Sequence, residues 1–270
     1  MNIEHTLITG GDGVVGSYID FGTRLGHTEL DVTDLASIRA ACKKYRPETI
    51  IHLAAATDLA RCEAEPAYAY AVNAMGTYHV ALVAREIGAK LIYVSTSGVF
   101  DGAKSQPYEP ADIPNPVNVY GHSKYLGELA ARGVLDDALV VRTAWVFGGG
   151  KEKDTKFVGK ILAQAGGREV KVVNDRRGSP TYAKDLARAL KTLVGQNASG
   201  IVHVGGGVAT REELAKEALS LARSSAAVVP VRTADFTSVY ASGENESMPT
   251  SPLVRPWRDA LREYIETEWS

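Results

Sequence analysis

A tyrosine and a lysine, Tyr120 and Lys124, stand four residues apart in the stretch NVYGHSKYLGE (118–128). In a helix this spacing puts both side chains on one face. A phenol titrates near pH 10, about three units above neutral, and a nearby ammonium group lowers its pKa by stabilising the phenolate. With 12 tyrosines in 270 residues, such a pair also arises by chance. The rest of the sequence must therefore decide between a proton donor and two surface residues.

Glycines recur at every third position of TGGDGVVG (9–16), directly after the apolar run HTLIT (5–9). Gly10, Gly13 and Gly16 would permit a tight turn and a close approach of the backbone to a pyrophosphate. Glycine turns after strands are common, but this one follows the first strand of an alternating chain. Its position predicts a nucleotide cofactor.

Short β-branched runs alternate with helical patterns along the chain. Strands are predicted at 5–9, 49–55, 90–96 and 138–147, and helices at 35–45, 66–87 and 118–133. This alternation is typical of βαβ units with a mostly parallel sheet. The predicted fold class is α/β, with a Rossmann-type doubly wound parallel sheet and a small C-terminal substrate-binding lobe.

A glycine-rich, charged break at 148–157 marks the predicted boundary of the lobe. Residues 1–147 are predicted to form the dinucleotide-binding domain, with 170–204 returning to it. Residues 148–169 and 205–270 would form the substrate-binding lobe. The polar segment 234–252 is rich in Pro, Gly and Ser, which indicates either an ordered loop over a site or a mobile lid.

Composition argues against several classes of function. A formal net charge of −2 provides no basic field for nucleic acid or an anionic membrane. No apolar run approaches the roughly 18 residues of a spanning helix, and MNIEHTLITG lacks a secretory pattern. Neither the two cysteines, Cys42 and Cys62, nor the six histidines show metal-ligand spacing. We therefore expect a cytoplasmic protein with no metal, no nucleic-acid partner and no membrane partner.

Taken together, these segments resemble those of a known family, the extended short-chain dehydrogenase/reductases, and more narrowly the dTDP-4-dehydrorhamnose reductases. The matching segments are TGxxGxxG (9–16), LDVTD (30–34), HLAAATDLARCEAEP (52–66), AVNAMGT (71–77), YVSTSGVFDG (93–102), PNPVNVYGHSKYLGE (114–128), VRTAWVFGGG (141–150) and GSPTYAKDLA (178–187). They occur in the family's order over most of the chain. The likeness is weakest at 17–29 and 234–252.

The resemblance implies NADP or NAD as the cofactor, with NADPH or NADH as the hydride donor, and identifies the residues that would hold it. These are Gly10, Gly13, Val14, Val15, Gly16, Asp31, Val32, Ala54, Ala55, Ala56 and Asn73, together with Tyr120 and Lys124. Asp31, at a strand end, would bond the adenine, or would instead cap the following turn. Asn73 would brace the neighbouring strands.

The resemblance also implies catalytic roles for Thr96, Tyr120 and Lys124. Thr96 would orient the substrate carbonyl, Lys124 would hold the nicotinamide ribose, and Tyr120 would deliver the proton. The residues that would contact the substrate are Thr96, Ser97, Trp145 and Arg177. Trp145 is otherwise plain core, and Arg177, like its neighbour Arg176, is otherwise solvated.

Two departures from the family pattern bear on specificity. Residues 17–30 are too few for a full helix, a loop and a second strand. The choice between NAD and NADP is therefore open, with Arg24 and His27 as the nearby groups suited to a 2′-phosphate. On the substrate side, Ser97 and Gly98 replace an acidic–aromatic pair, and an arginine–proline element expected near 241–249 is absent.

The sequence thus predicts NAD(P)H-dependent reduction of a nucleotide-linked 4-keto-6-deoxy sugar, as in dTDP-rhamnose biosynthesis. One alternative is an NAD-dependent nucleotide-sugar epimerase or dehydratase, which would recycle its nicotinamide. Another is a non-catalytic NADP-binding regulatory subunit, like the relative that partners methionine adenosyltransferase. A homodimer is left open.

Overall fold

The computed structural model describes residues 2–236 and 238–269. A six-stranded sheet runs in the order β10-β5-β4-β3-β1-β2, and every neighbouring pair in it is parallel. Its strands are β1 (Thr6–Thr9), β2 (Thr23–Leu25), β3 (Thr49–His52), β4 (Lys90–Thr96), β5 (Leu139–Thr143) and β10 (Gly200–Val204). The predicted Rossmann-type α/β fold is confirmed.

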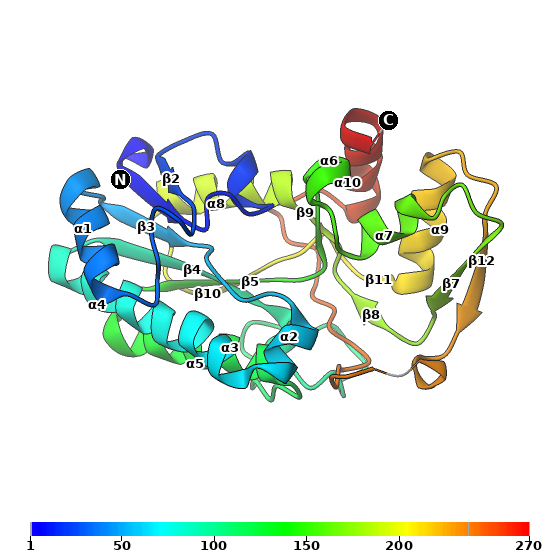
Figure 1. The fold of residues 1–270 in the computed structure, drawn as a ribbon, viewed down its shortest axis with the longest axis horizontal. Helices are drawn as coiled ribbons and strands as arrows, with labels where there is room; N and C mark the ends of the chain where they lie inside the picture. Colours follow the sequence, from blue (N-terminus) through cyan, green and yellow to red (C-terminus); the bar gives the residue numbers. More distant parts are fainter. Residues whose placement is uncertain (1, 237, 270) are drawn as a thin grey trace.

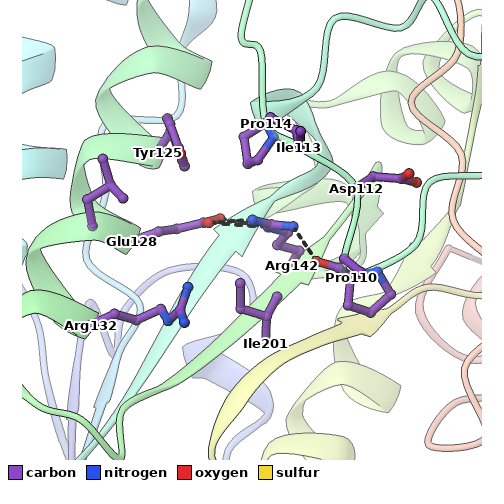
Figure 2. A pocket seen from close by; sticks show the side chains of 11 residues that line it. Pro110, Asp112, Ile113, Pro114, Tyr125, Glu128, Arg132, Arg142 and Ile201 are labelled. Carbon is purple, nitrogen blue, oxygen red and sulfur yellow. Dashed lines mark hydrogen bonds and ion pairs between the residues drawn. The ribbon is translucent and has the colours of Figure 1, made fainter.

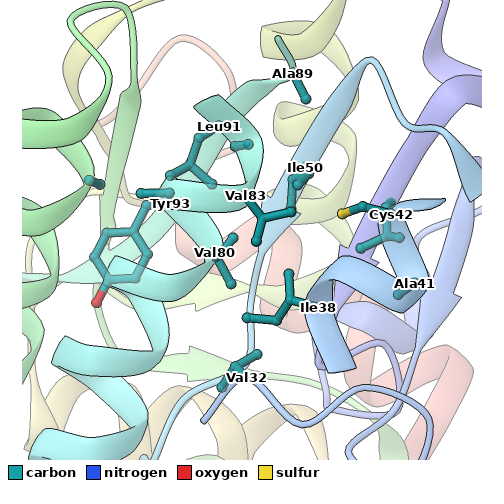
Figure 3. Close-up of a cluster of buried hydrophobic side chains, with 14 of the residues drawn as sticks. Val32, Ile38, Ala41, Cys42, Ile50, Val80, Val83, Ala89, Leu91 and Tyr93 are labelled. Atoms are coloured by element: carbon teal, nitrogen blue, oxygen red, sulfur yellow. The ribbon is translucent and has the colours of Figure 1, made fainter. Parts of the chain in front are cut away.

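Helices cover both faces of this sheet (Figure 1). One face packs against α1 (Leu35–Tyr45), α4 (Gly76–Ile87) and α5 (Val119–Val134), and the other against α8 (Ala183–Gly195). Neighbouring strand residues divide between the two cores: Ile50 joins the first and Ile51 the second, because successive strand side chains point to opposite faces. Figure 3 shows Ile38 of α1 and Val83 of α4 meeting Ile50 in the first core.

The loops that build the site leave the carboxyl ends of parallel strands, and these ends share one edge of the sheet. The shortened segment after β1 contains only a 3₁₀ turn, η2 (Gly16–Tyr18), before the three-residue β2, so the second strand is vestigial, as predicted. After β3, α2 (Leu59–Ala64) and α3 (Pro66–Tyr70) lead through a π-helical turn, η3 (Ala71–Met75), into α4.

The other elements form a smaller lobe, on the right in Figure 1. Its helices are α6 (Gly150–Lys153), α7 (Phe157–Ala163), α9 (Arg211–Leu221) and α10 (Trp257–Tyr264), which continues as the π-helical η6 (Ile265–Trp269). Its strand pairs are β6 (Val146–Phe147) with β9 (Thr181–Tyr182), β7 (Glu169–Val173) with β12 (Ala227–Val231), and β8 (Arg177–Gly178) with β11 (Ala209–Thr210). Short 3₁₀ turns lie at Ile3–His5, Ser97–Val99 and Thr233–Asp235.

The return to the main sheet begins later than residue 170, where it was predicted. β7 pairs with β12 in the lobe, whereas α8 packs on the main sheet and β10 extends it. The reason lies in β7 itself, whose first four residues alternate between exposed and buried. A strand with one polar face does not fit a sheet that helices cover on both sides.

Candidate active site

β4 and α5 bring Thr96 and Tyr120 together. Thr96 is the last residue of β4, and Tyr120 lies in the first turn of α5, where the Asn118 side chain accepts a hydrogen bond from the Gly121 N–H at 2.8 Å. The close approach requires glycine at 121, because a Cβ there would lie 2.1 Å from the Gly98 carbonyl oxygen. The glycine thus lets α5 pack on the loop that follows Thr96.

The Tyr120 side chain is partly buried. Burial raises the pKa of Tyr120 to about 12, while its hydrogen bond with Thr96 acts in the opposite direction. The phenol is therefore protonated at neutral pH and can act as an acid. The predicted lowering of this pKa by Lys124 is not what the protein alone produces, because desolvation outweighs the favourable contacts of the phenolate.

Lys124 lies one turn further along α5, with a side chain that is only 3% exposed. Its Nζ donates to the Val94 carbonyl at 2.7 Å and lies 4.2 Å from the centre of the Tyr93 ring. Burial lowers the pKa of Lys124 to about 7, and the negative charge of Glu128 acts against this shift. This ammonium is thus poised to lose its proton near neutral pH.

A buried ion pair supports this side of α5. Figure 2 shows Glu128 and Arg142 pointing toward one another beside a cavity of about 390 Å³. Two Arg142 nitrogens, Nε and Nη2, donate to Glu128 at 3.0 and 2.7 Å, and Ser95 Oγ donates to it at 2.6 Å. Neither Thr96 nor Tyr120 lines this cavity. The role of the Glu128–Arg142 ion pair is to hold α5 against β4 and β5.

The glycine turn after β1 has the backbone geometry that a pyrophosphate site needs. Gly10 has φ +66°, and a Cβ there would lie 2.7 Å from the Ala54 nitrogen. A Cβ at Gly16 would lie 2.7 Å from Gly11. Among residues 2–236 and 238–269, none accepts a hydrogen bond from the N–H of Val14 or Val15. Because η2 is too short for a helix dipole, these free N–H groups are what fits an anionic phosphate.

Asn73 holds the loop after β3 against α5, rather than bracing strands. Its Oδ1 accepts from the Ala56 N–H at 2.8 Å, and its Nδ2 donates to the Ala56 carbonyl at 3.0 Å and to Ser123 Oγ at 2.9 Å. The loop from Ala54 to Ala56 therefore runs beside Gly10 in a fixed position. Asn73 lies in the π-helical turn, a departure from regular helix that is frequent at functional sites.

Asp31 lies in a loop after β2, not at the end of a strand as predicted. Its Oδ1 accepts hydrogen bonds from the N–H and the hydroxyl of Thr33, at 2.9 and 2.7 Å, and these bonds lower its pKa. It therefore caps the following turn, which was the alternative interpretation. Val32 beside it is buried against Gly76, and contact of either residue with adenine stays a prediction.

Trp145 directly precedes β6 of the lobe and has a left-handed backbone conformation, with φ 43°. Its Nε1 donates to Glu246 Oε2 at 3.2 Å, and the Arg211 guanidinium carbon lies 3.5 Å from its ring centre. Gly178 packs against the indole so closely that a Cβ would lie 2.1 Å from Cε2. Four separate constraints therefore fix this ring, which is only half-buried.

The other predicted substrate residues differ in their exposure. Ser97 is 1% exposed, so its side chain does not line an open cleft, whereas the Arg177 side chain is exposed. Arg176 donates to Thr233 Oγ1 at 2.9 Å and to the Ser242 carbonyl, so it anchors loops of the lobe. Substrate contact by Ser97 and Arg177 stays a prediction.

Segment 234–252 is an ordered loop over the site wherever it is described; residue 237 lies outside the described residues. Asn118 Nδ2 donates to the Ala241 carbonyl at 2.8 Å, and Asn245 Nδ2 donates to the Lys104 carbonyl at 2.7 Å. Gly243 approaches the chain so closely that a Cβ would lie 2.5 Å from the Asp101 carbonyl oxygen. The loop is thus fixed to both α5 and the loop after β4.

Two lysines of the lobe contact the loops after β1 and β3, and no sequence motif indicates these contacts. Lys153 Nζ donates to the Asp12 carbonyl at 3.2 Å, and Lys156 Nζ donates to the Thr57 carbonyl at 3.1 Å. Each pair is about 100 residues or more apart in the chain, so no local motif could reveal it. These contacts close the lobe over the loops after β1 and β3.

The sheet domain and the lobe also contact each other at Tyr18, in the 3₁₀ turn that follows the glycine turn. Tyr18 and Tyr182 both donate to the Glu268 carboxylate, and the Gly149 N–H donates to the Tyr18 hydroxyl at 2.6 Å. Burial raises the pKa of both tyrosines, so both hydroxyls remain donors. The last helical turn therefore joins the lobe to the segment that follows the glycine turn.

Two further classes of site have no support in the described part of the chain. Within it, no three His, Cys, Asp or Glu side chains converge as a metal site would require. Likewise, no helix in residues 2–236 and 238–269 has both the length and the apolar character needed to cross a bilayer.

Comparison with known proteins places these features in a family. The model of the RmlD substrate binding domain matches residues 4–268. A dTDP-4-dehydrorhamnose reductase of Mycobacterium tuberculosis is 37% identical and covers 96% of this chain and 91% of its own length. The spore coat polysaccharide biosynthesis protein SpsK of Bacillus subtilis is 35% identical, over 88% of this chain and 85% of its own.

Solved structures agree with these matches. The dTDP-4-dehydrorhamnose reductase of Bacillus anthracis, crystallised with NADP, aligns with a TM-score of 0.91 at 31% identity, over 97% of this chain and 99% of its own. The UDP-glucose 4-epimerase of Thermus thermophilus, crystallised with NAD, aligns with a TM-score of 0.77 at 22% identity, over 97% of each chain. The second likeness shows the shared fold alone.

Proposed function

The chain belongs to the RmlD substrate binding domain family, that of the dTDP-4-dehydrorhamnose reductases, and from this premise we propose how its residues reduce a nucleotide-linked 4-keto-6-deoxy sugar. It is an NAD(P)-dependent oxidoreductase of the extended short-chain dehydrogenase/reductase type. The observation that carries the assignment of roles is the arrangement of Thr96, Tyr120 and Lys124 at the edge of the sheet that also carries the glycine turn.

The nicotinamide cofactor supplies the hydride when it is bound. The chain's own groups do the remaining work. Thr96 donates a hydrogen bond to the keto oxygen and fixes the angle of the carbonyl. Tyr120, protonated at neutral pH, delivers its proton to the same oxygen as negative charge develops there. Lys124 in its charged form holds the nicotinamide ribose and offsets the charge left on Tyr120.

The backbone of the glycine turn would hold the pyrophosphate through the free N–H groups of Val14 and Val15. Arg24 is the residue we assign to a 2′-phosphate, which would favour NADPH over NADH. Its guanidinium donates to the Gly16 carbonyl at 3.2 Å, so Arg24, the middle residue of β2, stands beside the glycine turn. Comparing kcat/KM for the two cofactors in Arg24→Gln tests this: NADPH should lose its advantage while NADH is unaffected.

The decisive test of the catalytic roles is Tyr120→Phe, with Tyr125→Phe of the same helix as the matched control. Tyr125 packs against the cluster of Val99, Phe100 and Tyr108. Tyr120→Phe should lower kcat by about 10²–10⁴-fold with NADPH binding nearly unchanged, and Tyr125→Phe should turn over normally. Turnover by Tyr120→Phe at the wild-type rate would show that another group supplies the proton.

The same assay separates the reductase from an epimerase or dehydratase. A reductase oxidises one NAD(P)H for each sugar converted, whereas an epimerase or dehydratase converts sugar with no net change in cofactor. A non-catalytic regulatory subunit would bind NADP and convert no keto sugar. A panel of 4-keto nucleotide sugars, followed at 340 nm and by product analysis, distinguishes the three.

Two wider properties belong to the same proposal. A homodimer is supported by exposed apolar side chains near the π-helical turn and α5, such as Met75 at 50% and Leu129 at 49% exposure, and light scattering coupled to gel filtration tests it.

A cytoplasmic location is supported by two buried, unpaired cysteines, Cys42 and Cys62. Fractionation of the source cells tests it.

A further inference from the structure

The lobe presents a charged side chain, Arg211, that the mechanism above does not use. It is the first residue of α9, and its guanidinium stacks between aromatic rings, 3.5 Å from the centre of Trp145 and 4.4 Å from that of Phe157. In the part of the chain that the structure describes, no group accepts a hydrogen bond from its side chain. Stacking fixes its plane and leaves its N–H donors unused.

Glu246 lies beside Arg211 and is also incompletely satisfied. Its Oε2 accepts from Trp145 Nε1 at 3.2 Å, while Oε1 receives no hydrogen bond from any described residue. Burial raises the pKa of Glu246, and the neighbouring charge of Arg211, the Trp145 bond and the charge of Arg176 oppose this in that order. The Glu246 carboxylate, a hydrogen-bond acceptor, and the Arg211 guanidinium, a set of donors, thus both contact the Trp145 indole.

This pair lies within electrostatic range of Tyr120. The negative charge of Glu246 is close enough to raise the pKa of Tyr120. Two hydrogen bonds fix the loop that carries Glu246. The Glu246 N–H donates to the Arg177 carbonyl at 2.8 Å, and the side chain of Asn118, the N-cap of α5, donates to the Ala241 carbonyl. The pair is therefore held in place on the loop rather than carried on a mobile segment.

We propose that Arg211 and Glu246 together bind hydroxyl groups of the sugar ring, and so determine which keto sugar is reduced. A hydroxyl both donates and accepts a hydrogen bond, which matches a carboxylate oxygen beside guanidinium donors. A diphosphate does not match, because Glu246 would repel it. The inference rests on the proposed reduction of a sugar at Tyr120, and it assigns this pair as a determinant of specificity.

The test is a cycle that combines protein variants with deoxygenated ligands. The probes are a dTDP-linked 6-deoxyhexose and its 2-deoxy and 3-deoxy counterparts, and their Kd values are measured by calorimetry with NADP present. In the wild type, at least one deoxy ligand should bind roughly 10- to 100-fold more weakly, as expected for a hydrogen bond to a charged group. In Glu246→Gln and Arg211→Gln, the parent should bind correspondingly weakly, and loss of that hydroxyl should cost less than about threefold.

Arg258→Gln is the matched control, since Arg258 also stacks on a tryptophan, Trp257 at 4.2 Å, but is 53% exposed on α10. It should retain the full discrimination of the wild type. Equal losses for the deoxy ligands in wild type and variants would overturn the proposal, as would failure of the wild type to bind any of the three ligands. If the wild type reduces no 4-keto sugar, the proposed function fails, while the binding cycle still decides the role of the pair.

Discussion

The burial of the Lys124 ammonium should lower the free energy of unfolding, and the Lys124→Met variant tests this directly. Its pKa falls from the ordinary 10.5 to about 7, chiefly because the ammonium is buried. At about 1.4 kcal/mol for each pKa unit, this fall corresponds to roughly 5 kcal/mol of cost to the folded state when the lysine is charged. The bond to the Val94 carbonyl, which the variant loses, is worth about 1–3 kcal/mol. A net gain of about 2–4 kcal/mol is therefore expected for Lys124→Met at pH 6.

The sign of the pH dependence follows from the direction of the shift. Below pH 7 both the folded and the unfolded states carry the proton, so the full cost of burying the charge is present. Between pH 7 and about 10.5 the unfolded chain binds more protons than the folded one, so wild-type stability rises with pH through this window. The advantage of Lys124→Met should shrink across the same window.

Urea unfolding of both proteins at pH 6 and pH 9.5 measures the effect, with unfolding free energies compared at each pH. Lys191→Met is the control, because Lys191 forms a surface ion pair with Asp20 and is 40% exposed; it should change stability by about 1 kcal/mol or less at either pH. A difference between Lys124→Met and wild type that is the same at both pH values would refute the depressed pKa. In the reductive direction, wild-type kcat/KM should fall about tenfold for each pH unit above 7, since the charged lysine is required.

Three other substitutions have outcomes that the packing predicts. Gly178→Ala would place a Cβ 2.1 Å from the Trp145 ring, so it should destabilise the protein by about 1–3 kcal/mol and raise KM for the sugar, measured by steady-state kinetics; an unchanged KM would mean that Trp145 does not shape the site. Arg142→Met leaves Glu128 unpaired in the core and should cost about 3–5 kcal/mol in urea unfolding, whereas adding Glu128→Met should restore most of that loss; equal stability of single and double variants would contradict this. Thr210→Ala removes the capping box of α9 and should cost about 1 kcal/mol without changing kcat.

The fold was predictable because its signals are local. Strands buried on both faces read as continuous apolar runs, and β4 and β5 were found from such runs. The assignment of 170–204 to the main domain is wrong for β7, because Glu169 and Lys171 are exposed and only Val170 and Val172 are buried. The alternation of exposed and buried side chains in β7 places it in the lobe, and a run of four residues is too short to show this alternation.

The site was predictable only where its residues lie close in sequence or match the family pattern. Tyr120 and Lys124 share one helix, and the glycine turn is contiguous. The contacts of Lys153 with Asp12, and of Trp145 with Glu246, join positions 141 and 101 residues apart. Each of these contacts depends on how the lobe packs against the sheet domain. That packing is a tertiary property, and the sequence of each separate element does not indicate it.

The contact between Tyr18 and Glu268 has a consequence for the timing of synthesis. The two residues are 250 positions apart, and a ribosome that adds roughly 5–20 residues per second makes the second about 10–50 seconds after the first. Throughout that interval the glycine turn and β1 exist without the carboxylate that receives the Tyr18 hydroxyl. A nascent chain therefore has its glycine turn early, but the hydrogen bond that fixes the adjoining Tyr18 forms only after residues 265–269 have left the ribosome.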